Sequence, residues 1–236
     1  MAYLMLLVVF ISNIMQAMTG FAGTMLAMPA SIQIIGLKSA SALLNVMGLT
    51  ASLLIAVPGY RHVDWRCMGR IMLGMLPGMV VGIFLAGFVN FPILKVFYGL
   101  FITGIALWRL LAGNSRTMPR WARGLMIPLA GVIHGLFVSG GSLLVLYAAE
   151  ALPDKRRFRA TLSMCWVVLN GILMVTHIAN ASFSAQTTWL TLLCLLALLP
   201  AIWLGNRLHA RISQNVFLKI SYILLIVSGL SLLLRF

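Results

Sequence analysis

The sequence predicts an all-α polytopic membrane protein with two inverted-topology repeats, each a broken or re-entrant helix pair followed by three transmembrane helices. Of its 236 residues, 62% are hydrophobic and 8% are charged, whereas about a quarter of the residues in soluble domains are charged. Apolar stretches follow one another with short polar gaps, which is typical of helical membrane proteins. Because no polar region is long enough for a soluble domain, we expect a single membrane domain over residues 1–236.

Six apolar segments of 19 to 22 residues are long enough to cross about 30 Å of hydrocarbon at about 1.5 Å per residue. They are Ser39–Tyr60, Met68–Val89, Ile93–Ala112, Ala160–Asn180, Thr187–Asn206 and Val216–Leu234.

Two other regions do not have the length of one spanning helix. Residues 2–37 are too long, and we expect two pieces parted near Gly20–Gly23. Residues 124–152 are better explained by two short pieces parted near Ser139–Ser142. Half-length pieces are typical of helices that re-enter the membrane or break around a cavity.

Proline and glycine positions indicate an internal duplication. Pro77 and Gly82 recur as Pro200 and Gly205, at an offset of 123 residues. Each half then holds one broken pair and three spans. We therefore expect repeat one at residues 1–112, a basic cytoplasmic linker at 113–123, and repeat two at 124–236.

The basic residues predict the topology. If each broken pair returns the chain to its starting side, 14 of the 17 Lys and Arg residues share one side, and only Lys38, Lys95 and Arg235 lie opposite. If each pair crosses once, the split is 9 to 8. Since basic loops stay in the cytoplasm, the first topology is favoured. Both termini are then extracytoplasmic, and the repeats have opposite orientation.

The two breaks are the predicted binding site. Helices that restart near Thr24 and Ser142 direct free N–H groups and a positive dipole end into the membrane, and this arrangement favours an anion. Close helix packing is the alternative use of such glycines. The predicted substrate-binding residues are Gln16, Thr19, Gly20, Gly23, Thr24, Asn45, His134, Ser139, Gly140, Gly141, Ser142, Thr161, Ser163 and Asn170.

Two spans also carry polar stripes. The first follows one helical face through Ser41, Asn45, Gly48 and Ser52, and the second recurs every seven residues at Ser163, Asn170 and His177. Such stripes face the bundle rather than lipid, where they either line a path or form interhelical hydrogen bonds.

Several classes of function are disfavoured. The only carboxylates are Asp64, Glu150 and Asp154, which lie in loops or near segment ends. A cation site usually needs an acid at membrane depth, so we expect a small anionic substrate held by uncharged donors. The three scattered cysteines form no metal motif, and we expect neither metal nor cofactor. The net charge of +14 is distributed between apolar segments, as topology signals are, so no nucleic acid is expected.

The order of these motifs resembles the TauE/SafE family, the sulfite exporter and toluene sulfonate uptake permease group. The resemblance covers nearly the whole chain and rests on these stretches: Gly20-Phe21-Ala22-Gly23-Thr24 with Pro29, Ala40-Ser41, Val63-Asp64-Trp65-Arg66, Gly135 through Ser142, and Ala160-Thr161-Leu162-Ser163. It implies a multi-pass permease of the bacterial inner membrane for sulfur-containing or related small organic anions.

We therefore expect a secondary transporter, not an enzyme, that moves a small anion by alternating access around a mid-membrane site between the two broken helices. The alternatives are a non-transporting membrane scaffold or assembly factor, and an intramembrane serine enzyme using Ser139 and His177. The basic run at residues 155–157 is mainly a topology signal, with recruitment of anions as a lesser role.

Overall fold

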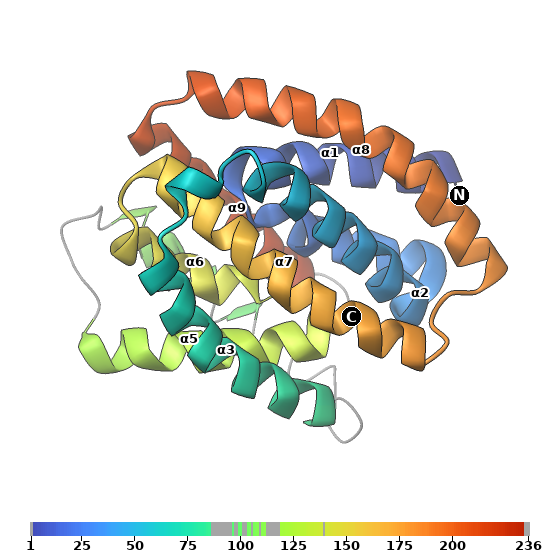
Figure 1. Ribbon diagram of the computed structural model, residues 1–236, viewed down its shortest axis with the longest axis horizontal. Coiled ribbons are helices and arrows are strands. Elements are labelled where there is room, and N and C mark those ends of the chain that lie inside the picture. The colour runs from blue at the N-terminus through green and yellow to red at the C-terminus, as the bar shows by residue number, and fades with distance from the viewer. Residues whose placement is uncertain are drawn as a thin grey trace. The chain divides into compact units, whose positions relative to one another are not determined.

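A computed structural model describes residues 2–85, 119–138 and 140–233, together with isolated residues between 96 and 111. Within these ranges the regular elements are all helices (Figure 1), which confirms the all-α class. The predicted span Ile93–Ala112 lies largely outside the described residues. The chain divides into two compact units, Met1–Arg70 with Asp154–Ile212, and Ile71–Pro153 with Ser213–Phe236.

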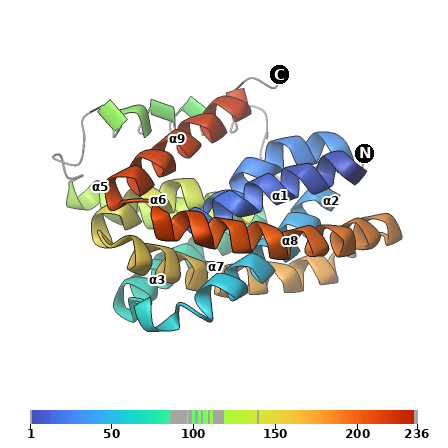
Figure 2. The ribbon, with the colours of Figure 1, turned by 90° about the horizontal axis from the view of Figure 1, so that it is seen from above.

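The first unit combines helices from both ends of the chain. It contains α1 (Ala2–Thr19), α2 (Ala22–Ala56), the short 3-10 helix η1 (Tyr60–His62), the start of α3 (Trp65–Leu85), α7 (Lys155–Ala179) and α8 (Ala185–Arg211). Helix α8 runs beside α1, and α2 contacts α1, α7 and α8 (Figures 1 and 2). Part of its core is the cluster Ala17, Ala51, Ile55, Leu198 and Ile202.

The first predicted break is confirmed. Helix α1 ends at Thr19 and α2 begins at Ala22, with Gly20 between them at a φ of 87°. Helix α2 then bends at Gly36, whose φ of 78° and ψ of 162° are not helical. Its first arm, residues 22–35, is about 20 Å long at 1.5 Å per residue, which is shorter than a hydrocarbon core of about 30 Å.

The second unit contains the second predicted break. It holds most of α3, α5 (Arg120–Phe137), α6 (Gly141–Ala151) and α9 (Gln214–Leu233). Helix α5 ends at a left-handed residue, Val138, with a φ of 53°. Helix α6 has only 11 residues, so it is about 16 Å long. The short second piece is therefore present in both halves of the chain.

Glycines allow close contact between α3 and α5 and between α8 and α1. In each case, the fourth predicted piece of one repeat packs on the first piece of the other. In the second unit, a Cβ atom on Gly78 or Gly82 of α3 would collide with the backbone of α5 at Pro128 or Val132. In the first unit, a Cβ atom on Gly205 of α8 would lie 2.5 Å from the Ile14 carbonyl oxygen of α1. This exchange of partners is expected for inverted repeats, and the inverted relationship itself stays a prediction.

Several helices begin earlier than the apolar pattern predicts, because polar residues outside the apolar stretch cap them. Helix α3 starts at Trp65 rather than Met68, since Asp64 Oδ1 accepts the Cys67 N–H at 2.9 Å. Helix α7 starts at Lys155 rather than Ala160, since Asp154 Oδ1 accepts the N–H groups of Arg156 and Arg157.

The later helices show the same kind of shift. Ser184 accepts the Thr187 N–H at 3.1 Å and starts α8 at Ala185, two residues before the predicted Thr187. Helix α8 then continues to Arg211, beyond the predicted end at Asn206. Helix α9 covers Gln214–Leu233, close to the predicted Val216–Leu234.

Five described helical segments are long and apolar enough to cross a membrane: α1, Ala30–Ala56 of α2, α3, α7 and α8. Their composition and the absence of strands within the described ranges define a helical multi-pass membrane protein.

Candidate functional site

Helices α7 and α8 hold the α1–α2 break in place. The Trp166 indole Nε1–H donates to the Gly20 carbonyl at 3.0 Å. The His209 Nδ1 lies 2.8 Å from the Met18 carbonyl oxygen. Arg159 packs on Gly20 so closely that a Cβ atom there would lie 3.1 Å from the Arg159 Cα. Glycine is thus required at residue 20 both by its positive φ and by this contact.

Two of the N–H groups at the start of α2, those of Ala22 and Gly23, are not free, in contrast to the expectation from sequence. The Gly23 N–H donates to Gln16 Oε1 at 2.8 Å, and the Ala22 N–H donates to Thr19 Oγ1 at 3.3 Å. The Thr19 hydroxyl itself donates to the Met15 carbonyl at 2.7 Å. In this conformation Gln16 and Thr19 therefore cap α2 from within the chain.

Three other predicted residues meet farther along α2 and α7. Asn45 Nδ2 donates to the Asn170 backbone carbonyl at 3.1 Å. A Cβ atom on Gly48 would lie 3.1 Å from both Asn170 Nδ2 and Thr24 Cγ2. The first arm of α2, its second arm and α7 therefore bring Thr24, Asn45 and Asn170 together around Gly48.

Four polar side chains on α2 and α7 are buried without satisfying all their hydrogen-bonding groups. We call Asn45, Ser52, Ser163 and Asn170 the α2–α7 polar seam. Each is at most 3% exposed. The Oδ1 atoms of both asparagines and the hydroxyls of both serines have no hydrogen-bond partner in the described structure. Native proteins leave few such groups, because each costs about 1–3 kcal/mol when buried.

The spacing of the seam follows from the helical repeat. Asn45 and Ser52 are seven residues apart on α2, and Ser163 and Asn170 are seven apart on α7, so each pair lies on one helical face. Ser52 belongs to the stripe seen in the sequence, but its burial and its unpartnered hydroxyl become evident only in the folded structure.

Thr161, also a predicted site residue, has a structural contact instead. Its Oγ1 accepts the backbone N–H of Asp64 at 2.9 Å. This bond joins α7 to the turn before α3, where Asp64 caps the helix. Thr161 is buried.

The predicted residues of the second break lie in the second unit. His134 is 2% exposed on α5, and Gly140 and Gly141 mark the start of α6. A Cβ atom on Gly140 would collide with the Ala130 carbonyl and lie 2.7 Å from the His134 Cβ, so this glycine lets α6 start against α5. Ser142 is in the first turn of α6, and Ser139 lies outside the described residues, so the pairing of Ser139 with His177 is not tested.

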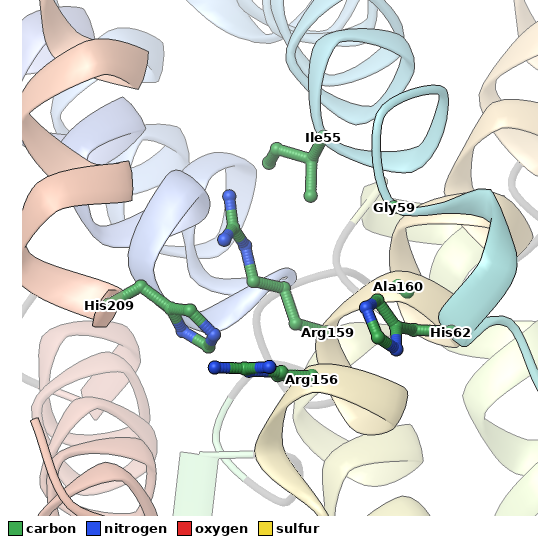
Figure 3. A pocket seen from close by; sticks show the side chains of 7 residues that line it. All are labelled: Ile55, Gly59, His62, Arg156, Arg159, Ala160 and His209. Carbon is green, nitrogen blue, oxygen red and sulfur yellow. The ribbon is translucent and has the colours of Figure 1, made fainter.

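One cluster was missed from the sequence. A cavity of about 190 Å³ in the first unit is lined by Ile55, Gly59, His62, Arg156, Arg159, Ala160 and His209. Figure 3 shows His62 and His209 on opposite sides of it, with Arg156 and Arg159 between them. These four residues, which we call the basic pocket, come from three separate stretches of the chain and share no sequence period that would have predicted it.

These features define a class of protein: a helical multi-pass membrane protein with a break in each of two helix pairs, α1–α2 and α5–α6, and a buried polar seam. The profile of the sulfite exporter TauE/SafE family matches residues 4–232, and the chain belongs to this family. It is therefore a membrane transport protein.

The chain also resembles a curated relative. It is 30% identical over 194 residues to the "Probable inner membrane transporter protein TsaS" of Comamonas testosteroni, over 80% of this chain and 81% of the relative. No solved structure matches the chain.

Proposed function

We propose that this protein is a secondary transporter of a small sulfur-containing anion, such as sulfite or a sulfonate, and that it works by alternating access. The description of its family as sulfite exporters supports the choice of anion. The name of the Comamonas relative, an inner membrane transporter, supports the bacterial inner membrane as its location. We place the basic side of the chain in the cytoplasm, following the distribution of Lys and Arg residues.

The α2–α7 polar seam is the observation that carries this proposal. An amide and hydroxyl cluster at a buried helix interface is costly unless a polar ligand or water completes its hydrogen bonds in some state. Serine hydroxyls and asparagine amides donate to the oxygens of a sulfite or sulfonate group. The chain's three carboxylates, Asp64, Glu150 and Asp154, lie outside the seam, so no acidic side chain of the seam repels an anion.

The hydrogen bond of Trp166 at the α1–α2 break links the α2–α7 polar seam to the helix movements that alternating access requires. Trp166 lies between Ser163 and Asn170 on α7 and donates to the Gly20 carbonyl. A shift of α7 at the seam therefore also pulls on the α1–α2 break. Glycine contacts between α8 and α1 and between α3 and α5 let helices slide at close range. Both features support alternating access by movement of the repeats.

A thermal-shift screen of the detergent-purified protein tests the binding step. The ligands are sulfite, sulfate, thiosulfate, sulfoacetate, taurine and simple carboxylates, with cations as controls. A ligand that binds the folded state raises the melting temperature by mass action. We expect a selective shift with one class of sulfur anion, and a shift with cations alone would contradict the proposal.

Matched variants locate that binding. Asn170→Leu removes a seam amide with little change in size, and we expect it to abolish the anion-dependent shift. Ser31→Ala is the control, because Ser31 is also a buried hydroxyl on α2 but donates to the Ala27 carbonyl at 2.8 Å. An equal anion-dependent shift in folded Asn170→Leu protein would rule out the seam as the site.

A further inference from the structure

The basic pocket is a second candidate for anion chemistry, separate from the seam. Its four basic side chains, His62, Arg156, Arg159 and His209, face one cavity, and none of the residues that line it is acidic. The other lining residues are Ile55, Gly59 and Ala160, which are small or apolar. The two arginines offer N–H donors and a positive field to a negatively charged ligand in this cavity.

Arg159 has hydrogen-bonding capacity left in this pocket. One of its terminal nitrogens donates to Asn206 Oδ1 on α8. Its Nε atom is buried and has no hydrogen-bond partner in the described structure. A guanidinium group binds oxyanions through two parallel N–H donors, and Arg159 brings such a group to the lining of the pocket.

Lys155, by contrast, has its ammonium group engaged elsewhere. Its Nζ donates to the carbonyls of His209 and Ile212, and thereby ties the start of α7 to the end of α8. This contact fixes the backbone that carries His209. Lys155 thus stabilises one side of the pocket, and the two arginine side chains line it.

The size of the cavity favours a small ligand. Its volume of about 190 Å³ corresponds to about six water molecules at about 30 Å³ each. Drug-sized ligands need about 300–1,000 Å³. The pocket therefore suits a small oxyanion such as sulfite, or the sulfonate end of a short organic anion.

The pocket also touches the α1–α2 break. His209 contacts the Met18 carbonyl and Arg159 packs on Gly20, so two of its four basic residues also hold the break. We propose that the basic pocket is an access site that binds a small oxyanion before it reaches the α2–α7 polar seam. This inference rests on the proposed transport function and adds to it a second binding site.

Calorimetric titration with sulfite and with methanesulfonate tests the pocket directly. Arg156→Ala is the first variant, because Arg156 is exposed and its truncation opens no buried cavity. Arg159→Gln is the second. The control is Arg211→Ala, which removes one positive charge from the last turn of α8 but does not line the pocket. We expect Arg156→Ala and Arg159→Gln to weaken binding about tenfold or more, and the control by less than about twofold.

The result that would overturn the pocket proposal differs from the result that would overturn the proposed transport function. If Arg156→Ala binds and transports like Arg211→Ala, while Asn170→Leu abolishes transport, the seam stands and the pocket proposal is wrong. If Asn170→Leu loses transport but retains arginine-dependent binding of sulfite, the separate pocket site is supported. If the wild-type protein transports no sulfur anion, the proposed function itself fails.

An anionic lipid headgroup has the same oxyanion chemistry, and nanodiscs separate the two sources. We expect the sulfite affinity of the wild-type protein to be the same in phosphatidylcholine discs with and without phosphatidylglycerol. Loss of sulfite binding in discs with phosphatidylglycerol, with no further effect of the lipid on Arg156→Ala, would assign the pocket to lipid and overturn the proposal.

Discussion

Gln16 and Gly23 lie on opposite sides of the α1–α2 break, and the Gly23 N–H donates to the Gln16 side-chain oxygen at 2.8 Å. An acceptor from α1 thus occupies a donor at the start of α2. The first arm of α2 is thereby held against the end of α1 in the conformation described. An anion that bound the Gly23 N–H would have to displace the Gln16 amide oxygen.

The close contact at Gly23 predicts a strong effect of a single methyl group. A Cβ atom on Gly23 would lie 2.8 Å from the Gln16 Cβ, so Gly23→Ala forces the two helices apart. We expect a loss of about 1–3 kcal/mol in stability, measured as a lower melting temperature in detergent. The control is Gly69→Ala on α3, where a Cβ atom meets nothing within 4 Å. Equal melting temperatures of the two variants would contradict this account of the break.

The indole of Trp166 is predicted to stabilise the break through its N–H group. Trp166→Phe keeps the ring in the core but removes the donor to the Gly20 carbonyl, and should cost about 1 kcal/mol. Trp189→Phe, at a position 64% exposed on α8, is the control. Hydrogen exchange at residues 18–23 should rise in Trp166→Phe alone. Unchanged exchange there would show that the bond does not hold the break.

The glycine contacts of α3 with α5 and of α8 with α1 predict that substitutions in the two units lower the melting temperature alike. Gly82→Ala and Gly205→Ala each place a methyl group against the backbone of another helix, at Val132 and Ile14. We expect each to lower the melting temperature, because overpacking typically costs about 1–3 kcal/mol. Gly124→Ala on α5, where a Cβ atom meets nothing within 4 Å, should leave it unchanged or slightly higher. A destabilising effect at only one of the two glycines would weaken the repeat relationship.

A substitution at Thr161 distinguishes a structural role of this residue from a role in substrate binding. Thr161→Val keeps the shape of the side chain but removes the acceptor of the Asp64 N–H. We expect a loss of about 1 kcal/mol in stability with no change in anion affinity, measured by melting and by titration on the same protein. A large loss of anion affinity in the folded variant would show that Thr161 binds the substrate, as the sequence predicted.

The sequence predicted the breaks well, because glycine clusters and helix lengths are local properties. Gly20 and the start of α6 at Gly141 lie where these patterns put them. Helix starts were misplaced by two to five residues, because Asp64, Asp154 and Ser184 cap helices outside the apolar segment that hydropathy detects.

The sequence did not predict which groups individual side chains contact. Gln16 and Thr19 have the chemistry of ligand contacts, yet tertiary structure directs both to backbone N–H groups. Arg156 and Arg159 were interpreted mainly as topology signals, because the histidines opposite them, His62 and His209, lie 94 and 50 residues away from Arg156 and Arg159, respectively. Such a pocket depends on how α2, α7 and α8 pack, which no single stretch encodes.

In the proposed mechanism, the α2–α7 polar seam holds the transported anion. The most direct measurement is counterflow of radiolabelled sulfite or sulfonate into proteoliposomes that contain wild-type, Asn45→Leu, Asn170→Leu or Ser31→Ala protein. We expect anion accumulation with the wild-type and Ser31→Ala proteins, and at least a tenfold loss of initial rate, about 1.4 kcal/mol, with each asparagine variant. Accumulation at the wild-type rate in correctly folded Asn45→Leu and Asn170→Leu protein would contradict the claim.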